Sequence, residues 1–295
     1  MPMPALYVLP FDHRGSFQKM LFPGVAELSD EQHGIIKNYK RVIFEAIKVI
    51  GGKRGYADLA VLVDEQYGLD IHQETKQLGL RNMLTIEKSG QDIFDFQYED
   101  WQQHLLDVHP SYAKALVRVV MGDDNSTQNS RLKLLNDFCA DNGIGFLIEP
   151  LIQPSPGDLE AVDGSKDRFD AELRPKRFAE AVAEMYAVGV KPDVWKIEGT
   201  ETKEAMDVCS EAAFNGGKQG VQIVILGRGA TMPKVEHWLR AGAKSKGVNG
   251  FAVGRTVFSD SIEKLHRGEI AQERAIQEIA ANYEHCIQVF EKARS

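Results

Sequence analysis

The sequence predicts a (β/α)8 barrel, the TIM-barrel fold of the α/β class, as a single domain over residues 1–295. Eight short apolar runs recur along the chain, a segment with helical spacing of apolar residues follows each of them, and the runs end in polar residues. Runs that are apolar throughout are typical of strands buried on both faces of a parallel sheet. A doubly wound open sheet is the alternative, but no Gly-x-Gly-x-x-Gly fingerprint follows the first run.

The predicted strands and helices alternate along the whole chain. We expect strands at residues 6–11, 59–63, 83–86, 115–121, 145–148, 193–199, 221–226 and 250–253. We expect helices near residues 30–50, 70–78, 99–108, 125–141, 175–188, 201–214, 231–242 and 268–292. Ser29 or Asp30 can cap the first helix, and Gly51 with Gly52 is expected to end it. Residues 152–171 are the longest segment without a predicted element, which is typical of a functional lid or a mobile loop.

Composition restricts the possible partners and locations. A net charge of −8 leaves no basic excess to neutralise phosphates, which argues against a nucleic-acid-binding protein. The chain has no apolar stretch near the length of a membrane span and no basic region typical of a signal peptide, so we expect a cytoplasmic protein. Cys139, Cys209 and Cys286 suit neither a metal site nor a disulfide framework, and we expect buried thiols in a reducing compartment.

Polar side chains collect at the carboxyl ends of the predicted strands, where the active sites of such barrels lie. The candidates for the site include Asp12, His13, Arg14, Asp64, Glu87, Arg118, Glu149, Lys196, Glu198, Arg228 and Arg255. His13 can transfer protons or simply hold Asp12, and the sequence leaves both roles open.

Lys196 is the candidate nucleophile. It lies in an apolar run bounded by Pro192 and Gly199, and lysine is rarely buried without a partner. Desolvation lowers the pKa of a lysine in general, and a neutral amine is a nucleophile. Glu198 projects to the same side of the strand as Lys196. A structural ion pair, or a lysine that snorkels at the strand end, is the alternative.

The last two strands end in glycine–arginine turns, which suggest a phosphate site. The turns contain Gly227, Arg228, Gly229, Gly254 and Arg255. Glycines let backbone N–H groups approach an anion, and arginine adds a bidentate charged contact, although an ordinary turn with a surface arginine has the same sequence. A lysine that faces a phosphate site fits Schiff-base chemistry on a phosphorylated ketone or aldehyde. Glu149, on the neighbouring strand, can remove the hydroxyl proton, or it can pair with Lys196 or Arg118.

These strand ends resemble those of class I aldolases of the tagatose-1,6-bisphosphate type. The matching runs are residues 63–68, 87–90, 147–149, 194–198 and 253–256. A nearer resemblance is to the domain fused to the sugar kinase of bacterial inositol catabolism (domain of unknown function 2090), carried by residues 9–14, 193–199, 226–230 and 250–256. The resemblance implies a barrel that cleaves 2-deoxy-5-keto-D-gluconate 6-phosphate to dihydroxyacetone phosphate and malonate semialdehyde.

The resemblance also implies site residues. It places the Schiff-base lysine at Lys196 and the acid/base glutamate at Glu149, while Arg118 stands where the tagatose-type enzymes have a lysine on strand four. We expect Glu198 and Asp64 to tune the lysine. Arg118 or Arg14 is expected to bind the substrate carboxylate.

Three interpretations of the function are compatible with the sequence. The enzyme can act on the keto-acid phosphate, or on tagatose 1,6-bisphosphate or a sulfosugar phosphate, or the barrel can be a non-catalytic phosphosugar binder. We expect no cofactor and no metal, because an iminium replaces a Lewis acid, although His13, Asp64 and Glu149 leave a metal site open. The expected partner is the small substrate, with a homo-oligomer possible.

Overall fold

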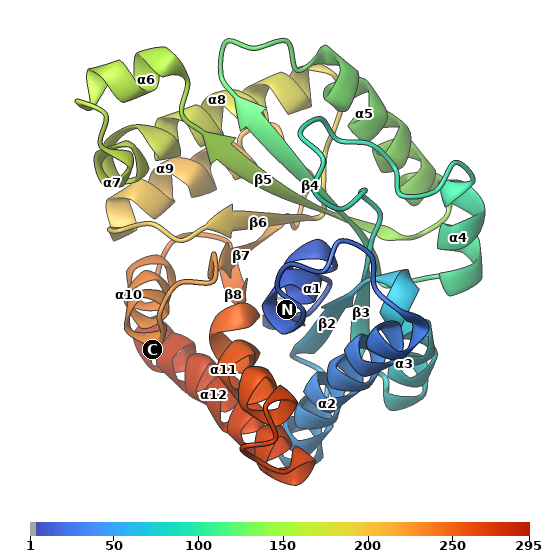
Figure 1. Cartoon of the computed structure of the whole chain (residues 1–295). Coiled ribbons are helices and arrows are strands. Elements are labelled where there is room, and N and C mark those ends of the chain that lie inside the picture. Colours follow the sequence, from blue (N-terminus) through green and yellow to red (C-terminus); the bar gives the residue numbers. More distant parts are fainter. Residues whose placement is uncertain (1–3) are drawn as a thin grey trace.

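The structure, a computed structural model, describes residues 4–295 and contains a closed barrel of eight parallel strands. Each strand pairs with the next one along the chain, and β8 closes the ring onto β1 (Figure 1). The predicted (β/α)8 barrel is therefore confirmed. The strands are β1 (Leu6–Pro10), β2 (Leu59–Val63), β3 (Arg81–Thr85), β4 (Tyr112–Val120), β5 (Gly145–Gln153), β6 (Val194–Glu198), β7 (Gln222–Leu226) and β8 (Val248–Ala252).

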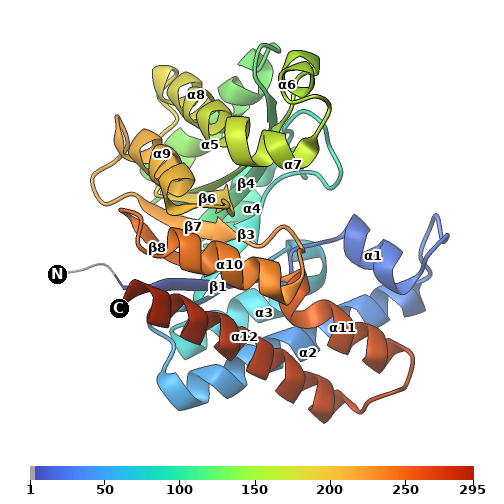
Figure 2. The same ribbon diagram turned by 90° about the vertical axis from the view of Figure 1, so that its left-hand side faces the viewer.

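Helices surround the ring of strands, and α2, α11 and α12 pack together on one flank (Figure 2). The helices are α1 (Gly15–Leu21), α2 (Asp30–Arg54), α3 (Glu65–Leu78), α4 (Trp101–Val108), α5 (Ser126–Asp141), α6 (Pro156–Ala161), α7 (Lys166–Arg168), the π-helical turn η1 (Phe169–Leu173), α8 (Arg174–Ala187), α9 (Lys203–Phe214), α10 (Met232–Gly242), α11 (Arg255–His266) and α12 (Gln272–Arg294). None of the helices within residues 4–295 is long and apolar enough to cross a membrane.

The helix α2 begins where the sequence predicts and ends later than predicted. Ser29 caps the helix in a capping box with Gln32, as expected. The prediction that Gly51 and Gly52 end the helix is wrong, because α2 continues to Arg54. A Cβ at Gly51 would lie 2.0 Å from the ring of Tyr56, which follows the helix, so this glycine lets the ring pack against α2.

Several elements lie where no element was predicted. Residues 152–171 are not irregular: β5 runs on to Gln153, and α6, α7 and η1 follow it. The short α1 and the longer α11 were also missed, and α11 begins at the Gly254–Arg255 turn itself. Ser155 caps α6 in a capping box with Asp158, so the polar residues that suggested a loop in this segment instead cap a short helix.

The barrel interior changes from apolar to charged along the strands. Side chains alternate between inside and outside, so residues two apart on a strand share a face. An apolar cluster fills the lower interior and includes Leu6, Val8, Ala60, Leu62, Met83, Leu147, Val194, Val224 and Ala252. The next inward positions toward the carboxyl ends are charged on β5 and β6, where Glu149 follows Leu147 and Lys196 follows Val194.

β4 and β5 are longer than the other strands. Each has nine residues, and their pairing continues from Tyr112 opposite Gly145 to Val120 opposite Gln153. In Figure 1 their arrowheads lie beyond those of the other strands, toward α6. The two strands therefore build a wall above one side of the barrel mouth.

The three cysteines are free and buried, as expected from their helical patterns. Burial raises the pKa of each thiol to about 12, so these groups stay protonated near neutral pH.

Candidate active site

Lys196 and Glu149 form the centre of the candidate site. Trp195 packs outward against Phe178 and Tyr186, so Lys196 projects into the barrel. The Lys196 Nζ donates to Glu149 Oε2 at 2.9 Å, and the two residues are only 3% and 5% exposed. The pairing of β5 with β6 thus holds an amine and a carboxylate in direct contact at the bottom of the cavity.

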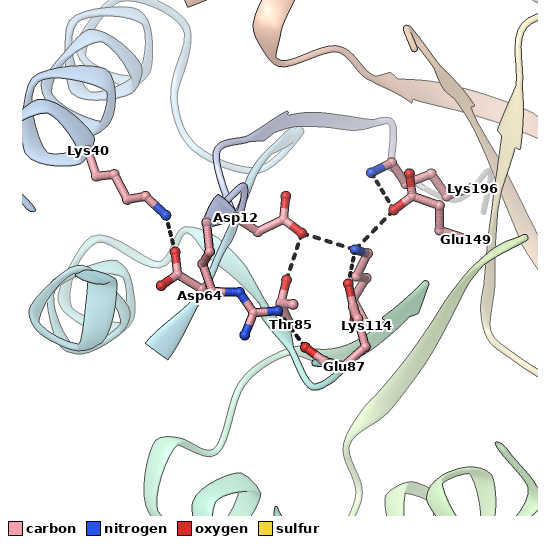
Figure 3. A network of polar contacts seen from close by, with 9 residues as sticks. Asp12, Lys40, Asp64, Thr85, Glu87, Lys114, Glu149 and Lys196 are labelled. Atoms are coloured by element: carbon pink, nitrogen blue, oxygen red, sulfur yellow. Dashed lines mark hydrogen bonds and ion pairs between the residues drawn. The ribbon is translucent and has the colours of Figure 1, made fainter. Parts of the chain in front are cut away.

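A second buried lysine, Lys114 on β4, joins this pair to two more carboxylates (Figure 3). Its Nζ lies 3.0 Å from Glu149, 2.6 Å from Glu87 and 3.0 Å from Asp12. Thr85 donates to the same Asp12 oxygen at 2.7 Å. The network therefore joins the segment after β1 to β3, β4, β5 and β6 and fixes the carboxylate that contacts Lys196.

Lys114 was missed because the fourth strand was predicted to begin at residue 115, whereas β4 begins at Tyr112. β4 carries a lysine, Lys114, on the same inward face as Arg118 and four residues before it, so the strand has an inward lysine in addition to the arginine that was singled out. Period-two alternation backward from Arg118 through Leu116 was the signal that could have found it.

The charges of the network are set by its own contacts. Burial opposes the charge of Lys114, but three carboxylates outweigh it and hold the pKa of Lys114 well above its ordinary value. Burial likewise opposes the charge of Glu149, yet Lys114 and Lys196 hold the pKa of Glu149 below its ordinary value. Against the same effect of burial, Lys114 holds the pKa of Asp12 well below its ordinary value. Burial raises the pKa of Glu87. Glu149 is therefore an ionised carboxylate, able to accept a proton.

The turns after β7 and β8 face the same cavity. Arg228, Gly229, Gly254 and Arg255 line it. Gly229 has a φ of 69°, and a Cβ at Gly254 would lie 2.2 Å from the Pro10 carbonyl oxygen, so both positions need glycine. Thr256 Oγ1 donates to the Ala230 carbonyl at 2.7 Å and ties the two turns together. The N–H groups of Arg255 and Thr256 come before the first hydrogen bonds of α11, which the N–H groups of Val257 and Phe258 donate to the Gly254 carbonyl, so the first two N–H groups can bind an anion.

A cavity of about 720 Å³ connects these parts. It is lined by the charged residues of the network and the turns, by Pro154 and Leu159, and by Lys166, Phe169 and Asp170 of the α7–η1 segment. A volume of this size accepts a small metabolite.

A family model described as "Uncharacterized protein conserved in bacteria (DUF2090)" matches residues 1–294. The chain belongs to this family. No curated protein sequence matches the chain.

The DUF2090 chain also resembles solved barrels. A Schiff base-forming fructose-1,6-bisphosphate aldolase is 15% identical, with a TM-score of 0.57 over 96% of this chain and 94% of that one. An archaeal fructose-1,6-bisphosphate aldolase, with its catalytic lysine covalently bound to the carbinolamine intermediate, is 14% identical, with a TM-score of 0.58 over 96% and 94%. Cgl0159 of Corynebacterium glutamicum is 15% identical, with a TM-score of 0.55 over 97% and 88%. At this identity the likeness shows the fold.

Glu198 does not contact Lys196 in the DUF2090 barrel. Its carboxylate lies 3.4 Å from Arg174 and 2.9 Å from Arg228, and burial raises its pKa despite these two arginines. Arg228 also pairs with Asp170 of η1 at 2.6 Å. Glu198 is expected to tune Lys196, but no direct contact between the two side chains supports this role. Through Arg228, the ion pairs of Glu198 connect β6 to Asp170 of η1. Arg228 was expected to bind a phosphate, but its guanidinium already pairs with the carboxylates of Glu198 and Asp170.

Asp64 lies apart from the cavity lining. It pairs with the buried Lys40 of α2 and accepts from the Tyr67 N–H at 3.0 Å, which caps α3 (Figure 3). Asp64 was expected to tune Lys196, but its carboxylate contacts Lys40 and the Tyr67 N–H, so no contact with Lys196 supports that role.

His13, Arg14 and Arg118 all line the cavity, whereas Gly227 is not one of the lining residues. The buried His13 Nδ1 has no hydrogen-bond partner, and burial lowers the pKa of His13 to about 4, so the ring is neutral. Asp12 is held by Thr85 and Lys114, so holding Asp12 does not depend on His13.

Arg14 donates to Gln97 at 2.6 Å and to the Glu87 carbonyl, which fixes the loop after β3. Across residues 4–295, no three His, Cys, Asp or Glu side chains are arranged to hold a metal ion. His13, Asp64 and Glu149 therefore do not form the metal site that the sequence left open.

Proposed function

We propose that this protein is a class I aldolase that forms a Schiff base through Lys196 and cleaves a phosphorylated keto acid. The observation that carries the proposal is the contact of Lys196 with Glu149 at 2.9 Å on the floor of a cavity of about 720 Å³. A buried amine that substrate can reach, beside an ionised carboxylate, is the arrangement that covalent catalysis on a carbonyl requires.

Proton transfer between the pair starts the reaction. Glu149 accepts a proton from the Lys196 ammonium, and the neutral amine attacks the substrate ketone. The carboxyl group gives this proton to the carbonyl oxygen, which becomes the carbinolamine hydroxyl. Glu149 then takes a proton from the nitrogen and passes it to the hydroxyl, which leaves as water and gives the iminium. Removal of the lysine charge takes away one of the two cations that lower the pKa of Glu149, so the carboxyl group can hold the proton while the amine attacks.

Bond cleavage uses Glu149 a second time. The carboxylate takes the proton of the hydroxyl on the far carbon, that hydroxyl becomes an aldehyde, and the carbon–carbon bond breaks. Its electron pair passes into the iminium and forms an enamine. Protonation of the enamine and hydrolysis of the resulting iminium release the ketone product and the free lysine. Lys114 keeps Glu149 oriented through each step by holding Oε2 at 3.0 Å.

The turns after β7 and β8 hold the phosphate. Arg255, with no carboxylate partner among residues 4–295, and the first N–H groups of α11 supply positive charge opposite Lys114. A phosphate on the carbon next to the ketone reaches these donors while the ketone lies at Lys196. This fits 2-deoxy-5-keto-D-gluconate 6-phosphate, whose cleavage gives dihydroxyacetone phosphate and malonate semialdehyde. The resemblance at residues 9–14, 193–199 and 250–256 supports the same substrate.

Turnover of purified protein tests the proposal. The substrates to compare are 2-deoxy-5-keto-D-gluconate 6-phosphate, tagatose 1,6-bisphosphate and a sulfofructose 1-phosphate, with dihydroxyacetone phosphate as the measured product. We expect the first to have the highest kcat/KM. Preference for either of the others would correct the substrate, and no cleavage of any of them would favour a phosphosugar-binding barrel.

A further inference from the structure

The cavity has positive charge on two opposite sides. In the closed ring β4 lies four strands from β8, which is the greatest separation that eight strands allow. Arg255 lines the cavity on the β8 side, whereas Arg118 of β4 and Lys166 of α7 line it elsewhere, at the β4–β5 wall and the segment that follows β5. A single phosphate at the β8 turn leaves these two cations unused.

Arg118 and Lys166 differ from most of the other cations around the cavity because neither has a carboxylate partner within residues 4–295. Arg118 donates only to the Gln91 carbonyl. By contrast, Lys88 pairs with Asp95 at 2.9 Å, and Arg228 pairs with Asp170 at 2.6 Å. Cations at a cavity wall that the protein leaves without counter-charge are suited to an anionic ligand.

Register places Arg118 near the reacting atoms. Leu116 is opposite Glu149, and Arg118 is opposite Leu151, so Arg118 is two residues further toward the mouth than Glu149. This separation corresponds to about 7 Å along the strands, within the reach of an extended arginine side chain. A substrate whose reacting hydroxyl meets Glu149 therefore extends its remaining carbons toward Arg118.

We propose that Arg118, assisted by Lys166, binds a second anionic group at the end of the substrate remote from its phosphate, and thereby selects the aldehyde half of the reaction. The guanidinium can bind a carboxylate or a phosphate through two parallel hydrogen bonds. This inference rests on the proposed aldolase function and adds the residues that recognise the second anionic group of the substrate.

Condensation in the synthetic direction tests the inference, because the acceptor aldehyde can be varied while dihydroxyacetone phosphate is kept constant. The acceptors are malonate semialdehyde with a carboxylate, glyceraldehyde 3-phosphate with a phosphate, and neutral glyceraldehyde. For the preferred anionic acceptor, Arg118→Gln should lower the ratio of its kcat/KM to that of glyceraldehyde by about 10- to 100-fold, the usual range for a lost hydrogen-bonded charge. Lys166→Gln should lower this ratio less, because its side chain is exposed.

Lys88→Gln is the matched control, because this lining lysine already has a carboxylate partner, and it should leave the ratio unchanged. Whichever anionic acceptor is affected identifies a carboxylate or a phosphate as the natural group. An equal loss for charged and neutral acceptors, or no loss for either, would overturn the inference. Trapping of dihydroxyacetone phosphate on Lys196 with borohydride separates this failure from failure of the function: the adduct forms without Arg118 taking part, and its absence in the unmodified protein would remove both proposals.

Discussion

Lys40 and Lys196 are both buried and each pairs with a carboxylate, yet of these two only Lys196 faces the cavity. Lys40 is 0% exposed, pairs with Asp64, and lies over the rings of Phe17 and Tyr67 at 5.8 and 5.1 Å. Lys196 is 3% exposed, pairs with Glu149, and lines the cavity.

The comparison separates burial from reactivity. Burial lowers the pKa of Lys40 even with Asp64 beside it, so a shifted lysine by itself does not identify the nucleophile. Aromatic rings and α2 close off Lys40, whereas a substrate can reach Lys196. Glu149 is also shared by two lysines, so the loss of one charge leaves it paired. We infer that Lys40–Asp64 fastens α2 to the barrel and that Lys196–Glu149 performs chemistry.

The largest expected effect is on turnover. Lys196→Ala should lower kcat by about four orders of magnitude or more, because Lys114, the other buried lysine of the lining, is held in its charged form by three carboxylates. Lys196→Arg keeps a cation beside Glu149 but cannot form an imine, and it should be equally inactive. Steady-state rates of dihydroxyacetone phosphate release measure both. Substantial activity in either variant would mean that Lys196 belongs with Lys40 as a structural residue.

Glu149→Gln should separate proton transfer from covalent bonding. The amide keeps the shape of the side chain but cannot accept a proton, so kcat should fall by about 10²- to 10⁴-fold, the usual contribution of a general acid–base. Single-turnover kinetics should show both slower imine formation and slower carbon–carbon cleavage. A rate that stays near that of the unmodified protein would assign the proton to another group, with His13 the next candidate.

Unfolding free energies should rank the two pairs in the opposite order. Lys40→Met leaves Asp64 buried without its partner and should cost about 3–5 kcal/mol, as for other broken buried pairs. Lys196→Met leaves Glu149 paired with Lys114 and should cost less. Urea denaturation monitored by circular dichroism compares the two. Equal losses would contradict the different roles, and the double variant Lys40→Met/Asp64→Asn should recover part of the stability.

The smallest expected effect is a change in pH dependence. Lys114 lowers the pKa of Glu149, so Lys114→Met should raise that pKa and move the acid limb of the kcat/KM profile to higher pH. An opposite charge at this distance shifts a carboxyl pKa by about 1–3 units. Lys114→Arg retains the charge and should leave the limb near its original position. A profile that does not move in Lys114→Met would show that Glu149 is not the titrating base.

The fold could be predicted because periodicity recurs over the whole chain. The eight apolar runs were found, and the strand predicted at residues 59–63 matches β2 fully. Boundaries failed where side-chain packing overrides local signals, as at Gly51, which gives space to the Tyr56 ring. Residues 152–171 look like a loop in composition, because serine and proline serve as caps and first-turn residues of short helices.

The site could be predicted only in part. Lys196 and Glu149 were singled out because charged residues in apolar strands are uncommon. Their contact, and the central place of Lys114, depend on strand register, which no local pattern contains. Asp64 and Glu149 each follow a predicted strand in the sequence, yet the partner of Asp64 is Lys40 of α2, 24 residues earlier, whereas Glu149 lies within β5. Which strand-end carboxylate faces the cavity is therefore decided by tertiary packing.

The most direct test of the account is to trap the intermediate. Dihydroxyacetone phosphate and borohydride are added to the protein, and the modified peptide is identified by mass spectrometry. The account predicts one reduced adduct per chain, on Lys196. No adduct, or an adduct on Lys114 or Lys40 in place of Lys196, would contradict it.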